Sequence, residues 1–225
     1  MPEVIQCAKI DFSFFDSIRC INLSDRRDRW IEACSEFESI GISGRVERFE
    51  AIKNDIGWKG LLDSFISLIR DAKKRNLRNI LILEDDITFL ERDPLYFEGV
   101  VNSIKELQDF HLFYLSANTN GRMKTKNDSL CIAKDCLSTH AVCYNHSIYD
   151  RILEDYDRMG YGMGFIDVYL KDNIQPMGKS FVSRKLLATQ KSGYSDIEGK
   201  NVNYDFIVNK FNSNVSRRRR GRHRR

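Results

Sequence analysis

Several features that would assign a chain of 225 residues to a familiar class are missing from this sequence. No apolar stretch approaches the length of a membrane-spanning helix. Residues 1–6 contain Pro2 and Glu3 and lack a basic segment followed by an apolar one, so we expect no secretory signal. What remains, 42% apolar and 30% charged residues, is typical of a soluble globular protein with one large domain.

The cysteines also lack the spacing of metal-binding motifs. The six are Cys7, Cys20, Cys34, Cys131, Cys136 and Cys143, and most of them lie inside apolar patterns. Buried thiols of this kind stay reduced in the cytoplasm, whereas secreted proteins usually pair their cysteines in disulfides. We therefore predict reduced thiols and a cytoplasmic location, in a bacterium or, for a viral protein, in its host cell.

The net charge of +4 comes from one end of the chain. The last nine residues contain seven arginines, and the rest of the chain has 29 basic against 32 acidic residues, a net charge of about −3. A dense block of like charge is disordered by itself and binds polyanions. We predict a globular domain over residues 1–212 and a disordered tail over 213–225. The polyanion-binding candidates are Arg217, Arg218, Arg219, Arg220, Arg222, Arg224 and Arg225. The alternative is that these arginines have no function of their own.

One stretch, ILILEDDITF at residues 80–89, changes abruptly from four large apolar residues to three acids. A short continuous apolar run predicts a strand buried on both faces, as in a parallel sheet covered by helices. Because three carboxylates cannot stay ionised in a core without partners, Glu84, Asp85 and Asp86 are expected where the strand emerges. Ligands of open α/β sheets bind there, and clustered carboxylates suit a divalent cation. An acidic turn with capping residues fits the same pattern.

Predicted strands and helices alternate through the first half of the chain. Apolar segments predict strands at residues 18–23, 45–51, 80–83, 111–115, 137–144 and 181–190. Helical spacing predicts helices near residues 30–40, 61–75, 94–107, 148–156 and 204–211, with Ile31 and Leu95 on core faces. Residues 119–128 are polar and are expected to form a surface loop near the site. This order predicts right-handed βαβ units, hence a single α/β domain whose mostly parallel central sheet is flanked by helices.

A dense polar cluster, NLSDRRDRW at residues 22–30, follows the first predicted strand. A strand-to-helix turn that opens a helix is a common phosphate-binding site, and Arg26 and Arg29 suit a diphosphate. A solvated helix face with alternating charge has the same spacing. The turn carries no glycine-rich fingerprint, so neither a dinucleotide-binding fold nor a P-loop is indicated.

Taken in order, these segments resemble glycosyltransferase family 25, which includes lipopolysaccharide sugar transferases and collagen galactosyltransferases. The similar motifs are INLSDRRDRW at 21–30, RFEA at 48–51, ILILEDDI at 80–87, and Gln190 followed by SDI at 195–197. The similarity runs through about residues 18–200. It implies the single-domain nucleotide-sugar fold called GT-A and a metal-dependent, inverting sugar transfer to an acceptor hydroxyl, of glycan or lipopolysaccharide type.

The resemblance also implies roles for individual residues. Glu84 and Asp86 would face Mn²⁺ or Mg²⁺ and the donor diphosphate, where the metal neutralises the leaving nucleoside diphosphate. Asp85 would lie nearer the donor sugar or ribose. The donor is expected to be a UDP-sugar, and the donor-binding candidates are Asn22, Leu23, Asp25, Arg26, Arg29, Asp85 and Gln190.

The sequence departs from the family pattern at one block. The family's Gly-Cys-x-x-Ser-His is matched by GLLDSF at residues 60–65, which keeps Gly60 and Ser64 and replaces the Cys and His by Leu61 and Phe65. The chemistry of that His is therefore excluded here, which weakens the link to the bacterial surface-glycan branch more than it weakens the fold prediction.

An inverting transfer needs a base for the acceptor proton, and Asp167 is the first candidate. It lies between Ile166 and Val168 after a Gly-rich turn and matches an Asp-aromatic position of the family; a helix cap fits equally well. Asp196 is the second catalytic candidate, either against the acceptor or as a turn residue. His140 and His146 are further candidates, although a lone His in an apolar strand is more often a core residue.

The sequence leaves the acceptor open. An acidic body with an arginine tail also fits a phage-type transferase that glycosylates modified, hydroxymethyl bases of DNA, or an enzyme held at an anionic membrane surface close to a lipid-linked acceptor. A binding module that holds a nucleotide sugar without turnover is a third hypothesis, which the altered block at residues 60–65 keeps open.

Overall fold

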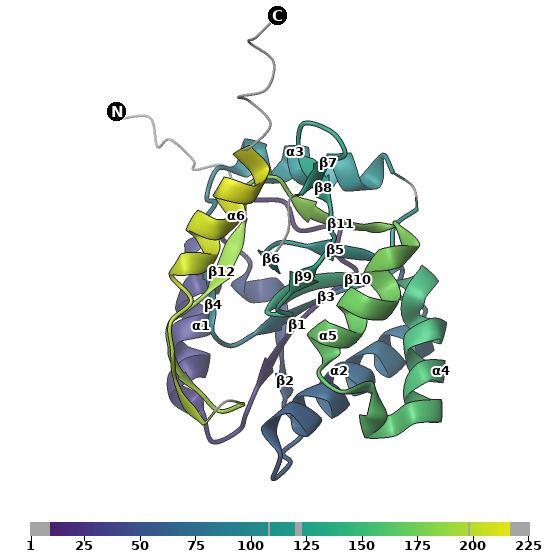
Figure 1. The fold of residues 1–225 in the computed structure, drawn as a ribbon. Helices are drawn as coiled ribbons and strands as arrows, with labels where there is room; N and C mark the ends of the chain where they lie inside the picture. Colours follow the sequence, from purple (N-terminus) through teal and green to yellow (C-terminus); the bar gives the residue numbers. More distant parts are fainter. Residues whose placement is uncertain (1–9, 108, 120–122, 198, 217–225) are drawn as a thin grey trace, which may run out of the picture.

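The computed structural model describes residues 10–107, 109–119, 123–197 and 199–216 (Figure 1). Eight strands form the central sheet, in the order β2-β1-β3-β10-β5-β11-β8-β7. Along the sheet these are Val46–Glu50, Ser17–Asn22, Asn79–Glu84, Ala141–Asn145, Leu112–Tyr114, Ser180–Ser183, Leu130–Ile132 and Lys124–Thr125. Only β10 and β8 run against the others, so the prediction of a mostly parallel sheet in an α/β domain is confirmed.

Helices cover both faces of this sheet (Figure 1). The α-helices, in order from α1 to α6, are Arg27–Ser39, Gly57–Lys74, Pro94–Lys105, Tyr149–Met159, Ile166–Tyr169 and Phe206–Ser216. One core cluster packs α2, α4, α5 and α6 against the sheet, and a second packs α1 and α3. Strand β3 contributes side chains to both clusters: Ile80 and Ile82 belong to the first, and Leu81 and Leu83 belong to the second. This confirms that the strand before the acids is buried on both faces.

Short elements connect this frame. Three two-stranded ribbons pair β4 with β12, β13 with β14, and β6 with β9. Strands β4 and β12 span Ile87–Phe89 and Ala188–Gln190. Strands β13 and β14 span Gly193–Ser195 and Lys200–Val202, and β6 and β9 span Asn118–Thr119 and Cys136–Leu137. The 3₁₀ turns η1, η2, η3 and η5 span Ser43–Arg45, His146–Ile148, Gly160–Met163 and Gln175–Met177, and η4, Leu170–Ile174, is a π turn. Among the described residues, no helix combines the length and the apolar character needed to cross a bilayer.

Two residues predicted on core faces point to solvent instead. Ile31 of α1 is 69% exposed and Leu95 of α3 is 76% exposed. In each helix the buried stripe begins two residues later, at Ala33 and at Phe97. Two residues span more than half a turn of an α-helix, so both side chains lie on the face away from the sheet.

Four predicted segments have different limits in the structure. The strand predicted at 137–144 is interrupted by Ser138, whose φ of +74° is incompatible with extended backbone, and residues 181–190 contribute to two strands. Within the segment 119–128, Thr119 pairs with Cys136 and residues 124–125 form β7, so part of the predicted loop is strand. The place of this segment near the site stays a prediction. Helix α6 runs to Ser216, past the predicted start of the tail, and the predicted polyanion-binding arginines at 217–225 lie outside the described residues.

Candidate active site

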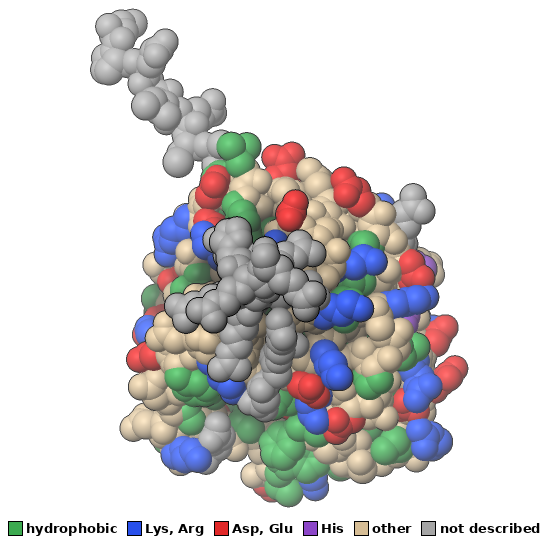
Figure 2. Space-filling view, turned by 45° about the horizontal axis from the view of Figure 1, so that its top comes forward, with side chains coloured by type: hydrophobic (Ala, Val, Ile, Leu, Met, Phe, Trp, Pro, Cys, Tyr) green, Lys and Arg blue, Asp and Glu red, His purple; other side chains and the backbone are tan. Residues whose placement is uncertain are grey.

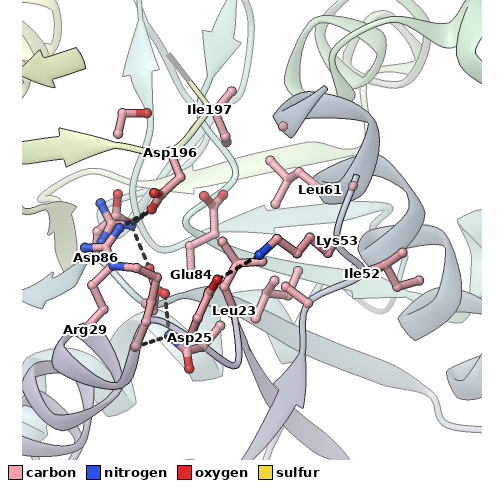
Figure 3. Close-up of a pocket in the computed structure, with 18 of the residues that line it drawn as sticks. Leu23, Asp25, Arg29, Ile52, Lys53, Leu61, Glu84, Asp86, Asp196 and Ile197 are labelled. Carbon is pink, nitrogen blue, oxygen red and sulfur yellow. Dashed lines mark hydrogen bonds and ion pairs between the residues drawn. The ribbon is translucent and has the colours of Figure 1, made fainter. Parts of the chain in front are cut away.

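A cavity of about 340 Å³ opens at the carboxyl ends of β1 and β3 (Figure 3). Four segments line it: residues 21–29 at the start of α1, residues 51–61 between β2 and α2, the acids at 84–86, and residues 190–204 near the end of the chain. The acids follow β3 at the sheet edge, as their sequence pattern predicted. The fold therefore brings four distant segments to one site.

This cavity collects nearly all of the predicted site residues. The predicted donor-binding and metal residues, with one catalytic candidate, line it together: Asn22, Leu23, Asp25, Arg26, Arg29, Glu84, Asp85, Asp86, Gln190 and Asp196. The predicted base Asp167 lies outside this set. Prediction from the motifs thus found one wall of the cavity and missed the wall between β2 and α2, where Ile52, Lys53 and Asn54 lie.

Protein partners hold Asp85 in place. Asn22 Nδ2 donates to Asp85 Oδ2 at 2.6 Å, and Arg29 Nη1 donates to Asp85 Oδ1 at 2.9 Å. Arg48 Nε donates to Asn22 Oδ1 at 2.8 Å, and its guanidinium lies 5.3 Å from the centre of the Trp30 ring. Both oxygens of Asp85 are therefore engaged, and this chain of contacts fixes the acidic turn against β1 and α1.

Glu84 and Asp86 are much less completely partnered. Thr139 Oγ1 donates to Glu84 Oε1 at 2.9 Å, and Gln190 Nε2 is 3.4 Å from Asp86 Oδ2. Asp86 Oδ1 is buried without a hydrogen-bond partner among the described residues. Desolvation is the main cause that raises the pKa values of both Glu84 and Asp86, and neighbouring carboxylates add to it. The protein thus places two carboxylates where little else compensates their charge.

A divalent cation fits this pair of carboxylates. No group of three or more His, Cys, Asp and Glu side chains in the described part of the chain is arranged to hold a metal by itself. Mg²⁺, however, is commonly bound through one or two carboxylates, and substrate phosphates and water complete its shell. Glu84 and Asp86, with the unpartnered Asp86 Oδ1, supply that number of ligands, so metal binding here calls for a ligand rich in phosphate oxygen.

Two arginines of the first strand-to-helix turn join α1 to the end of the chain. Arg26 forms ion pairs with Asp28 and Asp196, and Arg29 also donates to the carbonyl oxygen of Tyr194. Figure 3 shows Arg29 and Asp196 on the same side of the cavity as Asp86. Asp196 is therefore held by a cation rather than aimed at a free hydroxyl. Positive charge lies along this wall at the start of a helix, an arrangement suited to an anion.

The loop between β2 and α2 forms the opposite wall. Ser64 Oγ accepts from the Ile52 amide at 2.8 Å, and a side chain at Gly60 would collide with the Ile52 carbonyl oxygen. Gly60 and Ser64, the two residues kept from the family block, thus shape this loop. Phe65, which replaces the family's His, is completely buried and packs 6.0 Å from the ring of Tyr144. The altered block therefore has a structural role here, and its retained glycine and serine were the signal for the missed wall.

Asp167 does not line the cavity. It is in the first turn of α5, where its carboxylate accepts from the amides of Val168 at 2.8 Å and Ser138 at 3.2 Å. Its charge is among those that raise the pKa of Glu84, after the larger effects of burial, Asp86 and Asp85. Asp167 and Glu84 are thus bonded by neighbouring residues of the loop after β9, Asp167 by the Ser138 amide and Glu84 by the Thr139 hydroxyl.

The two histidines are poorly placed to act as bases. His140 is fully buried, neither ring nitrogen has a partner among the described residues, and burial lowers its pKa to about 3. His146 lies in η2 and lines a second cavity with Asn79, at the amino end of β3. Because the acids follow the carboxyl end of that strand, His146 is separated from them by the length of the strand.

Neither a protein-family model nor a curated protein sequence matches this chain, so its resemblance to glycosyltransferase family 25 has no support from a family match. Solved structures similar to it include a glycosyltransferase involved in glycosylation of the major capsid of PBCV-1, at a TM-score of 0.47 and 12% identity, over 74% of this chain and 79% of that one. Another is a UDP-glucose pyrophosphorylase complexed with UDP-glucose. Its TM-score is 0.44 at 10% identity, over 88% of this chain and 79% of that one. Similarity at this level carries no argument about chemistry, which has to come from the site.

Proposed function

We propose that this protein is a metal-dependent inverting glycosyltransferase that takes its sugar from a nucleotide-sugar donor, with a UDP-sugar as the first candidate. The observation that carries the proposal is the pair of underpartnered carboxylates, Glu84 and Asp86, which line one cavity together with the arginine-bearing start of α1. A cation and a diphosphate together suit the carboxylates and the arginines, because the cation needs phosphate oxygens and the diphosphate needs positive charge.

In the proposed reaction, the acceptor hydroxyl oxygen attacks C1 of the donor sugar from the face opposite the diphosphate. The bond from C1 to the phosphate oxygen breaks, its electrons leave with the nucleoside diphosphate, and the new glycosidic bond has the inverted configuration. Asp167 accepts the acceptor proton, for which its position beside Glu84 is suitable. Asp196 has a supporting role, because its contact with Arg26 closes the arginine wall over the donor.

The residues around the donor have separate tasks. A cation held by Glu84 and Asp86 would supply charge neutralisation of the leaving diphosphate. Arg26 and Arg29 orient the diphosphate, for which their pairs with Asp196 and Asp85 have to loosen or be shared. Leu23 and Ile52 give the cavity an apolar component that suits the faces of a nucleoside.

The test is a donor screen by thermal unfolding, with release of nucleoside diphosphate measured in parallel. UDP-glucose, UDP-galactose and UDP-N-acetylglucosamine are titrated with and without Mn²⁺. A ligand at about a hundred times its Kd stabilises a protein by about 2.7 kcal/mol, which gives a clear shift in Tm. We expect such a shift only with Mn²⁺ or Mg²⁺ present, together with slow donor hydrolysis.

A matched pair of variants locates the effect. Asp86→Asn removes the charge from the cavity, and Asp109→Asn removes one from an exposed ion pair with Lys179. Only Asp86→Asn should abolish the metal-dependent shift. Stabilisation by donor without any turnover would favour the nucleotide-sugar-binding module, and no response to any nucleotide sugar would contradict the proposed donor class.

A further inference from the structure

Three aromatic rings gather beside the cavity without being buried in the core. Tyr161 in η3 and Phe165 before α5 are 40% and 50% exposed, and Trp58 in the first turn of α2 is half-buried. The Trp58 ring centre lies 6.1 Å from that of Tyr161, edge to face, and 5.4 Å from that of Phe165. Exposed rings from three separate elements thus form one aromatic platform, Trp58–Tyr161–Phe165.

Polar groups surround this platform at its edges. Tyr161 and Tyr156 both donate their hydroxyl protons to Asp63, each at 2.7 Å. The Nζ of Lys59 lies 4.8 Å from the Tyr161 ring centre and 5.7 Å from that of Trp58. An exposed apolar surface bordered by polar residues is typical of a binding site, and these groups offer hydrogen bonds just beyond the rings.

The platform lies between the donor cavity and the proposed base, Asp167. Asn54 Nδ2 is 3.5 Å from the Tyr161 hydroxyl, and Asn54 also lines the donor cavity. Gly57, the neighbour of Trp58, lines the cavity as well. On the other side, Phe165 precedes Asp167 by two residues at the start of α5. An acceptor held on these rings would therefore lie within reach of both the donor and the proposed base.

We infer that this platform is the acceptor subsite and that the acceptor is a carbohydrate, one ring of which stacks on Phe165, the most exposed of the three rings, with Trp58 inclined by 39° beside it. A pyranose ring has an apolar face of C–H groups and a rim of hydroxyls. It therefore needs aromatic faces with hydrogen-bonding groups at their edges, which is what Asp63, Lys59 and Asn54 provide. This inference rests on the proposed sugar transfer for its meaning, but the binding of a carbohydrate can be tested by itself.

The charges near the platform do not favour a nucleic acid. A duplex or single strand is bound mainly through lysines and arginines that contact phosphates. Here Lys59 lies over the rings, and Arg70, the next cation along α2, pairs with Asp157 at 3.0 Å. Over the face drawn in Figure 2, acidic and basic side chains are interspersed rather than gathered by sign. A base stacked on these rings would have Lys59 beside it, but no row of cations along which a phosphate backbone could run.

The test measures carbohydrate binding directly, without donor. Maltotriose, cellotriose and triacetylchitotriose are titrated into the full chain and followed by saturation-transfer NMR. Phe165→Ala removes a half-exposed ring, so the fold is not at risk, and it should weaken binding about tenfold. Phe165→Tyr, which keeps the ring, should retain it. The matched control is Tyr96→Ala, which removes a half-buried ring that also has a lysine over it, Lys185 at 5.2 Å, but on α3 at the other end of the molecule (Figure 1).

Trp58 gives a second readout that needs no variant of the platform. The chain has two tryptophans, so in a Trp30→Phe background the emission reports Trp58 alone. A bound sugar should shift that emission saturably, with the Kd found by NMR.

Two results would overturn the inference: carbohydrate binding that Phe165→Ala leaves unchanged, or binding of a hydroxymethylcytosine oligonucleotide, but of none of the sugars, to these rings. Failure of the proposed transfer would look different, because the sugars would bind to the platform while no nucleotide sugar was bound or consumed.

Discussion

Two acidic sites of this protein, the buried Asp155 and the half-buried acids that line the cavity, differ in how completely their charges are hydrogen-bonded or paired. Asp155 of α4 is 5% exposed and receives hydrogen bonds from Arg151 at 2.6 Å, Arg158 at 2.5 Å and the Tyr169 hydroxyl at 2.8 Å. Burial by itself would raise the pKa of Asp155, but these three partners outweigh it and lower the pKa to about 2. The carboxylate is ionised at neutral pH and fully used in the fold.

The acids after β3 have the opposite character. Desolvation raises the pKa of both Glu84 and Asp86, and one oxygen of Asp86 has no partner among the described residues. Between these two, Asp85 is held by Asn22 and Arg29. Charge that the fold leaves uncompensated indicates a ligand, whereas charge that it compensates indicates structure. The predictions below test this distinction, in order of expected effect.

The largest effect is expected at Asp167. Two amides already donate to its carboxylate, so it could belong with the structural acids such as Asp155 or with the ligand-binding acids such as Asp86. Asp167→Asn keeps the size of the side chain and removes its ability to accept a proton. If Asp167 is the base, transfer should fall roughly hundred- to ten-thousandfold, and donor hydrolysis measured without acceptor should fall far less. Asn is also a good capping residue, so near-normal transfer would place Asp167 with the structural acids.

The next effect concerns Asp86. Asp86→Asn should lower metal-dependent donor turnover roughly hundred- to thousandfold, because one carboxylate opposite the leaving diphosphate is lost. Stability should not fall, since an underpartnered charge is removed. Turnover assays over a Mn²⁺ titration and urea unfolding check the two halves. A folded variant with normal Mn²⁺-dependent turnover would remove Asp86 from the site.

At Asp155 we expect the reverse pattern, a loss of stability with unchanged turnover. Asp155→Asn should cost about 2 kcal/mol at pH 7, because charge-assisted hydrogen bonds are lost. Since the pKa is lowered on folding, the unfolded chain binds more protons between pH 4 and 2, so this contribution is complete above pH 4 and disappears as the pH falls to 2. Urea unfolding of both proteins at pH 7 and pH 3 checks this: the difference between them should shrink at pH 3.

The smallest effect on folding and chemistry is expected from removing residues 217–225, which belong to neither acidic site. Tm and donor hydrolysis should stay unchanged, because the effect of these arginines is restricted to polyanion affinity. Binding of the full and shortened chains to duplex DNA is measured at several salt concentrations. A steep salt slope that the shortened chain loses would indicate DNA contacts by these arginines, and loss of donor hydrolysis would show that they belong to the active site.

The accuracy of the sequence predictions varied with the range of the interactions behind them. The helix predicted near residues 94–107 is present and begins at Pro94, where Asp93 accepts from the Leu95 amide at 3.0 Å, because an N-cap is decided within a few residues. The orientation of that helix was less well predicted, since Leu95 points to solvent. Which stripe of a helix is buried depends on the angle at which the sheet meets it, and composition alone does not give that angle.

The candidate site shows the same limit. Each wall carried a local signal: the acids after an apolar strand, the arginines before a helix, and the retained Gly60 and Ser64. The aromatic platform carried none, because Trp58 lies about a hundred residues before Tyr161 and Phe165 and each is an ordinary aromatic residue in its own segment.

By itself, the sequence determined that an apolar strand ends in three carboxylates at the edge of an α/β sheet, since a strand's period and the cost of burying charge are local properties. Only the tertiary structure decided what each carboxylate does. Asp85 meets Arg29 across 56 residues and Asp196 meets Arg26 across 170, while Asp86 meets no comparable partner in the described chain. Such pairings follow from the order in which strands lie beside one another, which no short segment of the chain contains.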